Sequence, residues 1–150
     1  MAKRIIFNKS EPIMHKACKP VTDFDRKLAS LLDDMHDTLT AADGVGLAAP
    51  QVGFLRRICV IDAGEGYYEL INPVILESSG SQRDVEGCLS CPNEWGYVTR
   101  PMNVKFKAQD RNGMWYEKSV EGLFARAVCH ELDHLEGRLF VDLIEEYVDK

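Results

Sequence analysis

The sequence has no apolar stretch long enough to cross a membrane, since none approaches the roughly 20 residues that a bilayer requires. The apolar run near the N-terminus stops at Asn8 and Lys9, which is too early for a secretory signal peptide. The five cysteines are an odd number without paired spacing, which argues against a disulfide framework. These absences predict a protein of the reducing cytoplasm without a membrane anchor.

Positive charge is also scarce. Lys and Arg number 18 against 24 for Asp and Glu, giving a net charge of −6, so the overall balance does not favour non-specific binding to nucleic acid. Internal repeats, low-complexity segments and linkers are absent from the sequence. A chain of 150 residues that is 45% hydrophobic is predicted to form one domain, residues 1–150, with a sizeable core.

The apolar periodicity predicts two helices and a larger number of short strands. Residues 24–39 repeat apolar side chains at helical spacing, with Thr22 or Asp23 as the expected cap. Residues 123–135 are apolar on nearly all sides, which is typical of a helix buried in the centre of a domain. The expected strands are residues 57–61, 67–71, 74–76, 97–99, 104–108 and 114–116, with hairpin turns at 64–66 and 110–113.

This order of elements predicts an α+β fold. Antiparallel β-sheets are expected to pack around a central helix that carries an HExxH motif, with one further N-terminal helix.

The segment 43–53 is rich in glycine, but it does not fit a phosphate-binding loop, because no Lys-Ser/Thr pair follows it. Glycines at 44 and 46 allow another backbone to approach this one closely. Two interpretations remain open from this stretch alone: a tight turn that leaves the first helix, or an edge along which a peptide lies.

The HExxH motif is the strongest chemical signal in the chain. His130 and His134 are four residues apart, so on a helix both imidazoles project from one side and are able to reach one metal ion. Glu131 lies beside them as a candidate base for a metal-bound water. Two imidazoles and a carboxylate buried in an apolar helix need partners, and a metal would supply one.

A third ligand must come from elsewhere, because position 140, where one class of zinc protease has its third histidine, is Phe140. Cys88 and Cys91 offer two thiols. One thiol with the two histidines would leave a position open for catalysis, whereas both thiols would close a structural zinc site in a binding module. Cys91 and His130 are 39 positions apart, against about 12–15 in zinc fingers, which argues against the closed site. Cys88 and Cys91 are an odd number of positions apart, and Pro92 favours an extended Cys91, so the two side chains are expected to face opposite ways, which favours Cys88 alone.

Three segments, 44–51 (GVGLAAPQ), 86–90 (EGCLS) and 130–134 (HELDH), resemble the motifs of peptide deformylases in order and separation. The resemblance covers almost the whole chain. It implies a metal-dependent hydrolase of N-terminal protein processing, which removes the formyl group from the formyl-methionine of nascent polypeptides and releases formate. It also implies one divalent metal as cofactor, with Fe(II) as the native ion and Zn, Ni or Co able to replace it.

The same resemblance assigns roles to residues near the metal. A metal-bound water attacks the formyl carbonyl, and Glu131 acts as general base and then general acid. Gln51, through its side-chain amide, and Leu89, through its backbone N–H, stabilise the oxyanion that forms. The implied metal ligands are Cys88, His130 and His134.

Substrate binding is likewise implied by the resemblance. Val45 and Gly46 pair with the substrate backbone as an added strand, with Gly87 near the opposite side. Leu123 and Ala127 precede His130 on the same helical face and are expected to line the pocket for the methionine side chain.

Two further expectations concern charges and partners. Arg100 and Asp133 are expected to form a buried pair that steadies the motif helix, with two separate surface charges as the alternative, and Glu86 to fasten the Cys88 strand. The expected partners are formyl-methionyl nascent peptides, met in transient proximity to the ribosome. The protein is expected to act as a cytoplasmic monomer, without nucleic-acid specificity and without a membrane.

Overall fold

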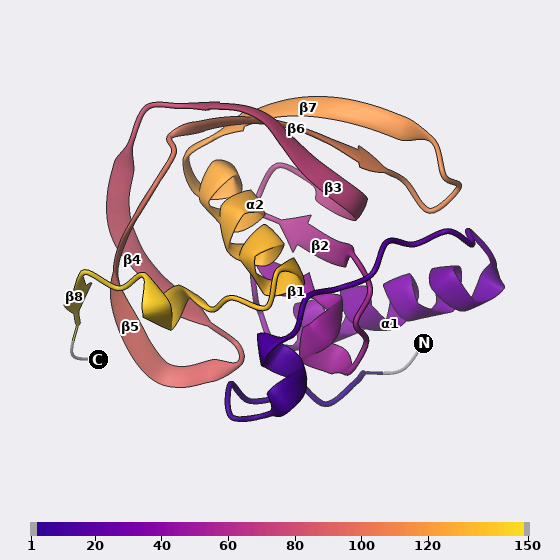
Figure 1. The fold of residues 1–150 in the computed structure, drawn as a ribbon, viewed down its shortest axis with the longest axis horizontal. Coiled ribbons are helices and arrows are strands. Elements are labelled where there is room, and N and C mark those ends of the chain that lie inside the picture. The colour runs from indigo at the N-terminus through magenta and orange to yellow at the C-terminus, as the bar shows by residue number, and fades with distance from the viewer. Residues whose placement is uncertain (1–2, 149–150) are drawn as a thin grey trace.

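The computed structural model describes residues 3–148, and it is an α+β fold in which antiparallel sheets surround a central helix (Figure 1). This confirms the predicted fold class. Of the expected domain 1–150, residues 1–2 and 149–150 lie outside the described residues. The helices are α1 (Arg26–Ala41) and α2 (Gly122–Leu135), with short 3-10 turns η1 (Pro12–His15), η2 (Ala49–Val52) and η3 (Phe140–Asp142).

Two antiparallel sheets enclose α2. The first has the order β1-β2-β3-β6-β7, and the second has the order β4-β5-β8. β1 is an edge strand of the first sheet, and β4 is an edge strand of the second. Both strands carry residues of the candidate site described below. The strands are β1 (Gly46–Ala48), β2 (Ile58–Asp62), β3 (Tyr67–Ser79), β4 (Gln82–Cys88), β5 (Cys91–Arg100), β6 (Asn103–Gln109), β7 (Trp115–Glu121) and β8 (Glu146–Tyr147).

Strand β2 is buried on both faces, which explains its continuous apolar sequence. Ile58 and Val60 pack in the cluster that includes the apolar side of α1. Cys59 and Ile61 point the other way and pack in the cluster that includes α2. The first sheet therefore lies between the two helices and separates two apolar layers.

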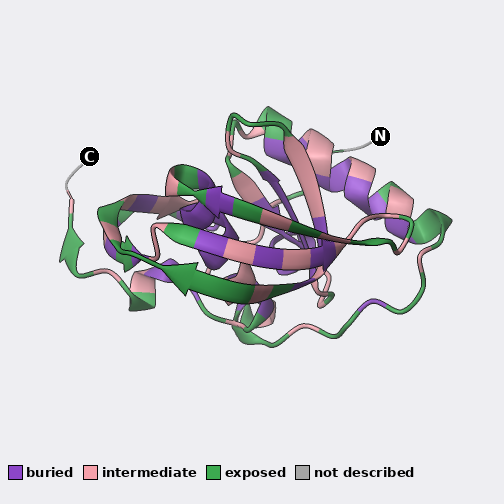
Figure 2. Ribbon diagram, turned by 90° about the horizontal axis from the view of Figure 1, so that it is seen from above, coloured by how far each residue is buried: buried purple, intermediate pink, exposed green. Residues whose placement is uncertain are grey.

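Helix α1 covers the outer side of this sheet, with one buried and one exposed side (Figure 2). Its N-cap is Asp25, whose carboxylate accepts a hydrogen bond from the Leu28 N–H at 3.0 Å. The expected cap at Thr22 or Asp23 is therefore wrong, and Phe24 precedes the helix. Several residues between 22 and 25 have capping side chains, and only the path of the incoming chain selects one of them.

The predicted hairpins are both present. β2 pairs with β3 from Ile58↔Ile71 onward, and β6 pairs with β7 across a turn closed by the Gly113 N–H on the Asp110 carbonyl. The expected strand 74–76 is a continuation of β3, beyond an irregularity at Asn72, which has φ of 52°. Strands β1, β4 and β8 were not predicted, because they are short or strongly polar and lack apolar alternation.

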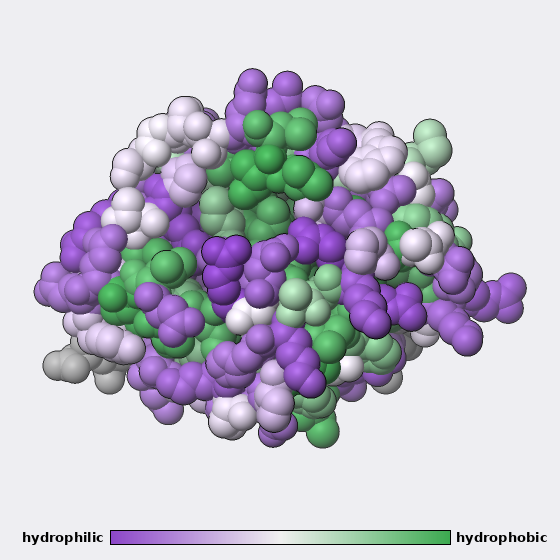
Figure 3. Space-filling view, viewed as in Figure 1, coloured by the Kyte–Doolittle hydropathy of each residue, from purple (hydrophilic) through white to green (hydrophobic). Residues whose placement is uncertain are grey.

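The exterior has no single apolar face on the side drawn in Figure 3, where apolar residues form separate patches divided by hydrophilic ones. Neither helix in residues 3–148 combines the length and the hydropathy that crossing a bilayer demands. The apolar side chains concentrate around α2 and between α1 and the sheet. The central position of α2 is what brings its polar residues next to both sheets.

Candidate metal centre and its cavity

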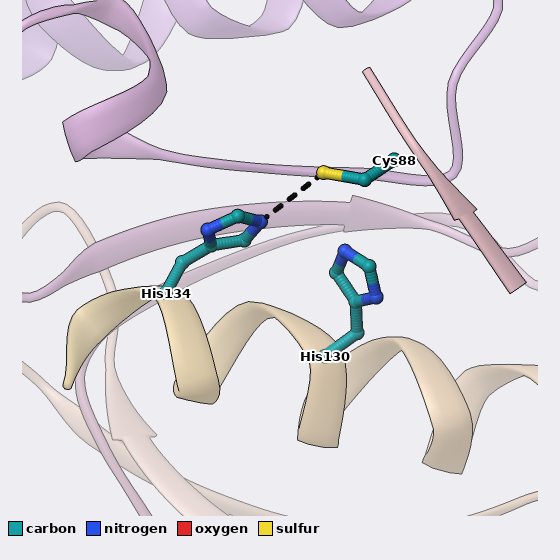
Figure 4. A group of neighbouring side chains, drawn as sticks. All are labelled: Cys88, His130 and His134. Atoms are coloured by element: carbon teal, nitrogen blue, oxygen red, sulfur yellow. Dashed lines mark hydrogen bonds between the residues drawn. The ribbon is translucent and has the colours of Figure 1, made fainter. Parts of the chain in front are cut away.

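Three potential metal ligands converge between α2 and the end of β4. The ligand atoms of Cys88, His130 and His134 all lie within 4.8 Å of one another. The Cys88 Sγ atom is 3.3 Å from Nε2 of His134, and both imidazoles rise from one side of α2 towards the sulfur (Figure 4). The helical spacing of four residues places the two rings on that side. Both histidines are buried, whereas Cys88 is partly exposed.

Glu86 fixes the orientation of His130. The Nδ1 atom of His130 lies 2.9 Å from Oε1 of Glu86 and donates to it, so the Nε2 atom is directed to the ligand cluster. Burial alone would raise the pKa of Glu86, but hydrogen bonds from His130 and Arg100 lower it to about 2. The carboxylate is therefore ionised, which keeps it an acceptor for the imidazole N–H.

Two arginines neutralise Glu86. Arg100 donates to both carboxylate oxygens at 2.8 and 3.0 Å and also binds Asp133 at 2.8 Å. The expected Arg100–Asp133 pair is thus present, with the Arg100 side chain 6% exposed. Arg126 donates to Glu86 and to the Val98 carbonyl. Sequence reasoning missed Arg126, although an arginine within an apolar helix is itself a sign of a buried partner.

Glu131 is placed beside the cluster by the same helix. It is 4% exposed, and burial raises its pKa to about 7. Gly46 makes room for it, because a Cβ atom at position 46 would lie 2.6 Å from Oε2 of Glu131. Among residues 3–148, Oε1 of Glu131 and Nδ1 of His134 are the buried side-chain polar atoms that lack a hydrogen-bond partner. The unpartnered Oε1 is therefore available to a ligand.

Gln51 and Leu89 lie next to Cys88, the sulfur-containing member of the ligand cluster. Gln51 is 1% exposed, donates to Oγ of Ser90 at 3.1 Å and lies 3.7 Å from Sγ of Cys88 through Nε2. Its Oε1 accepts from the Ala48 N–H at 2.8 Å, which fixes the direction of the amide. Leu89 lines the cavity described next, whereas Gln51 is not among the residues that line it.

A cavity of about 450 Å³ opens onto the cluster. All five residues predicted to bind substrate line it, together with Glu131, Cys88 and His130. A larger hollow of about 650 Å³ lies at the ends of β3, β6 and β7 and contains none of the predicted residues, so it is not the candidate site. The lining also includes Asp43, Val85, Pro92, Trp95 and Arg126, which the motifs did not assign to the site.

Cys91 does not belong to this group of ligand atoms. It pairs with Cys88 across the β4–β5 turn and is buried with Val98 and Phe140, in a cluster against which Cys88 also packs. Within residues 3–148, the only group of three or more His, Cys, Asp or Glu side chains with metal-ligand proximity is Cys88, His130 and His134. This arrangement does not provide the fourth ligand of a closed structural zinc site.

The residues fit a divalent ion. A hydrogen bond with Cys91 and burial both raise the pKa of the Cys88 thiol, so an ionised sulfur at this position requires a cation beside it. Burial also lowers the pKa of His134 well below its ordinary value, which keeps that imidazole neutral and its nitrogen free to bind a metal. An α+β protein with a Cys-His-His centre, a buried HExxH glutamate and an adjoining cavity belongs to the metal-binding hydrolases.

Comparison with known proteins identifies the family. The model of the polypeptide deformylase family matches residues 3–149. A peptide deformylase from Caldicellulosiruptor bescii is 55% identical over 150 residues, which cover 100% of this chain and 90% of that protein. Peptide deformylase 1 of Clostridium acetobutylicum is 53% identical over 146 residues, covering 97% of each chain. The chain belongs to the polypeptide deformylase family and is an enzyme.

Solved structures agree with this assignment. The crystal structure of the peptide deformylase from Thermotoga maritima superposes with a TM-score of 0.94 at 40% identity, covering 97% of this chain and 99% of that one. The peptide deformylase from Synechococcus elongatus, solved in complex with actinonin, gives a TM-score of 0.90 at 37% identity and covers 94% of this chain and 78% of that one.

Proposed function

We propose that this enzyme removes the formyl group from the N-terminal formyl-methionine of nascent polypeptides and releases formate, and that residues 1–150 form one catalytic domain. The observation that carries the proposal is the position of Glu131: it lines the cavity beside the cluster of Cys88, His130 and His134, and its buried Oε1 has no hydrogen-bond partner. Family membership supports the same activity.

Cys88, His130 and His134 would hold one divalent ion. When bound, such an ion polarises a carbonyl oxygen and makes water acidic enough to attack near neutral pH. A thiolate and two imidazoles suit both Fe(II) and Zn. We propose Fe(II) as the native ion, with Zn, Ni or Co able to occupy the site in the purified protein.

Glu131 carries the proton in this proposal. Its Oε1 takes a proton from the attacking water and later delivers it to the amine that leaves with the peptide. A pKa of about 7, raised by burial, suits a carboxylate that must accept and release a proton near neutral pH. Gly46 permits this position, since any side chain there would displace the carboxylate.

The formyl oxygen becomes negatively charged during the attack and needs donors. We assign this task to the amide of Gln51 and the backbone N–H of Leu89. The Ala48 N–H and Ser90 hold the Gln51 amide from both ends, so it is oriented before substrate arrives. Loss of one such donor typically costs about 2.7–4 kcal/mol of transition-state stabilisation.

The two sheet edges would hold the peptide. β1 and β4 are both edge strands, and Val45, Gly46 and Gly87 line the cavity from the β1 and β4 sides. An extended peptide between them gains backbone hydrogen bonds as an added strand. Leu123 and Ala127, on α2, provide the apolar wall for the methionine side chain.

Formate release tests the proposal. The full-length protein is loaded anaerobically with Fe(II) or Zn, its metal content is measured, and a formyl-Met-Ala-Ser peptide is supplied. We expect formate and free Met-Ala-Ser, and no hydrolysis of the Met–Ala bond. A protein that holds one equivalent of metal and releases no formate would refute the proposed activity. The expected monomeric state, proximity to the ribosome and indifference to nucleic acid stay predictions.

A further inference from the structure

Cys88 and Cys91 face each other at the turn of the second sheet. Cys88 is the last residue of β4 and Cys91 is the first residue of β5, and the two are directly opposite across the turn formed by Leu89 and Ser90. Opposite residues of antiparallel strands project from the same face and have Cα atoms about 4.5 or 5.5 Å apart. A disulfide bond spans Cα separations of roughly 4.4–6.8 Å. The backbone of this hairpin therefore suits a covalent bond between the two sulfurs.

The two thiols are already in contact. Each is a hydrogen-bond partner of the other, and Cys88 packs against the apolar cluster that contains Cys91. The turn between them is held in place, because the Ser90 carbonyl accepts from the Lys9 N–H at 2.9 Å and the Ser90 hydroxyl accepts from the Gln51 amide at 3.1 Å. Formation of a disulfide therefore requires rotation of the two side chains and no rearrangement of the strands.

The two sulfurs differ in their access to solvent. Cys88 is partly exposed and lines the cavity, whereas Cys91 is 1% exposed and is not among the lining residues. A small oxidant that enters the cavity therefore meets Cys88 first. The other cysteines belong to a different cluster, in which Cys59 and Cys129 are buried and against which Cys18 packs. An accessible cysteine in contact with a second one is the arrangement of a redox site with a resolving thiol.

We propose that Cys88 and Cys91 form a reversible disulfide when a peroxide enters the cavity, and that this modification removes Cys88 from the metal centre. With hydrogen peroxide, the Cys88 sulfur attacks one oxygen and the O–O bond breaks, which leaves Cys88 as a sulfenic acid and releases the other oxygen as water. The Cys91 sulfur then attacks the Cys88 sulfur. The S–O bond breaks, and its oxygen leaves with the Cys91 proton as a second water. Overall the two sulfurs lose two electrons, and one peroxide is reduced to two molecules of water.

The disulfide changes the metal centre, and this part of the inference rests on the proposed ligand set. A thiolate binds a divalent ion, whereas a disulfide sulfur carries no negative charge to offer. Only His130 and His134 would remain, so the ion is expected to dissociate. The disulfide also keeps Cys88 from the irreversible sulfinic and sulfonic acids, because a dithiol returns it to the thiol. Cys91 therefore makes the loss of metal and activity reversible.

Zinc-loaded, full-length protein tests the inference, because zinc itself has no redox chemistry. Equimolar hydrogen peroxide is added and the remaining thiols are alkylated under denaturing conditions. Mass spectrometry is then applied to peptide 84–105, which contains Cys88 and Cys91 but none of the other cysteines. We expect this peptide to have lost two hydrogens and to carry no alkyl group, and one equivalent of zinc to appear in solution. A dithiol with added zinc should restore formate release.

Replacement of Cys91 separates a resolving role from a packing role. Cys91→Ser should form no disulfide, its Cys88 should gain two or three oxygens, and a dithiol should recover little activity. Should the buried hydroxyl prevent folding, Cys91→Ala carries the same test. Cys18→Ser is the matched control, because Cys18 is also partly exposed but lies outside the lining of the cavity. This variant should form the disulfide as the unaltered protein does.

The outcomes separate this inference from the proposed function. If peroxide leaves both thiols of the unaltered protein intact, or oxidises Cys88 to an acid without a disulfide, the redox pair is overturned and the deformylase activity stands. Recovery of Cys91→Ser by a dithiol to the same extent as the unaltered protein also overturns it. A disulfide that forms while the zinc stays bound refutes Cys88 as a metal ligand. A folded, zinc-loaded protein that releases no formate before oxidation refutes the activity, whereas the mass of peptide 84–105 still decides the disulfide.

Discussion

Oε1 of Glu86 lies 2.9 Å from Nδ1 of His130, and this contact joins the second sheet to the central helix. Glu86 is on β4, two residues before Cys88, and His130 is on α2. One carboxylate therefore orients an imidazole and at the same time ties the strand that carries Cys88 to the helix that carries His130 and His134. Arg100 and Arg126 supply the positive charge that such a buried carboxylate requires.

The depressed pKa of Glu86 predicts a loss of stability in acid. Its pKa is about 2 in the folded protein against an ordinary value of 4.5, so its contribution is fully present above pH 4.5 and is lost as the pH falls towards 2. A shift of this size corresponds to about 3 kcal/mol. Glu86→Gln should lower the free energy of unfolding of the metal-free protein at pH 7. Between pH 4.5 and 2 the free energy of unfolding of this variant should fall less steeply than that of the unaltered protein.

Urea unfolding of metal-free protein at a series of pH values checks this, with Glu145→Gln as the control. Glu145 is an exposed carboxylate paired with Arg83. Its replacement should leave the decrease in unfolding free energy between pH 4.5 and 2 nearly unchanged. If the unfolding free energies of the Glu86→Gln and unaltered proteins fell equally steeply between pH 4.5 and 2, Glu86 would not be the source of the acid sensitivity.

Replacement of Gly46 by Ala should damage activity more than stability. The new Cβ atom would lie 2.6 Å from Oε2 and 2.9 Å from Cγ of Glu131, so the carboxylate must move. A displacement of about 1 Å at a reacting group lowers kcat by roughly 100-fold. Gly64→Ala is the control: nothing lies within 4 Å of its Cβ and its φ is 90°, so it should lose stability and keep kcat. Equal kcat values for both variants would rule out the steric role of Gly46.

Glu131→Gln should retain metal and lose deformylation. Glutamine preserves the size of the side chain but does not accept and return a proton, so kcat should fall by about two to four orders of magnitude. Metal content and formate release are measured on the same sample. Near-normal turnover would remove Glu131 from its proposed role, whereas loss of metal would show that Glu131 acts on the ligand cluster instead.

Cys88 and Cys91 should differ sharply when each is replaced by serine. Cys88→Ser removes a sulfur ligand and should abolish activity while weakening metal affinity by more than about 100-fold, because losing even an outer hydrogen-bond partner costs 10- to 100-fold. Cys91 packs with Val98 and Phe140, so Cys91→Ser should bind metal and turn over almost normally. Competition with a chelator gives the affinities. The opposite ranking would restore the structural zinc site.

Much of the candidate site follows from local spacing. The HExxH spacing predicts that two imidazoles share one side of a helix, and the structure has them there. The apolar sequence around them predicts a central helix, which α2 is. The odd separation of Cys88 and Cys91, together with Pro92, predicted that one thiol would join the histidines, and the ligand cluster contains Cys88 alone. The reason behind this prediction was wrong, because the two cysteines are not on one extended strand but are paired across the β4–β5 turn, with a hydrogen bond between their thiols.

Other features depend on contacts between residues far apart in the chain. Strand β4 forms without an apolar pattern by pairing with β5, and Arg126 reaches Glu86 across 40 positions. The approach of Gly46 to Glu131 is of the same kind. In each case the partner lies outside the local sequence.

The sequence by itself determined which side chains could bind a metal, which segments would become the two helices and the apolar strands, and which faces of these elements would be buried. Only the tertiary structure decided which carboxylate orients His130, why position 46 has no side chain, and that Trp95 covers Gly87 at the cavity wall. The physical reason is that apolar periodicity indicates which side of a helix or strand is buried, but not which other segment packs against that side. That choice is made by packing and by pairing of charges when the whole chain folds.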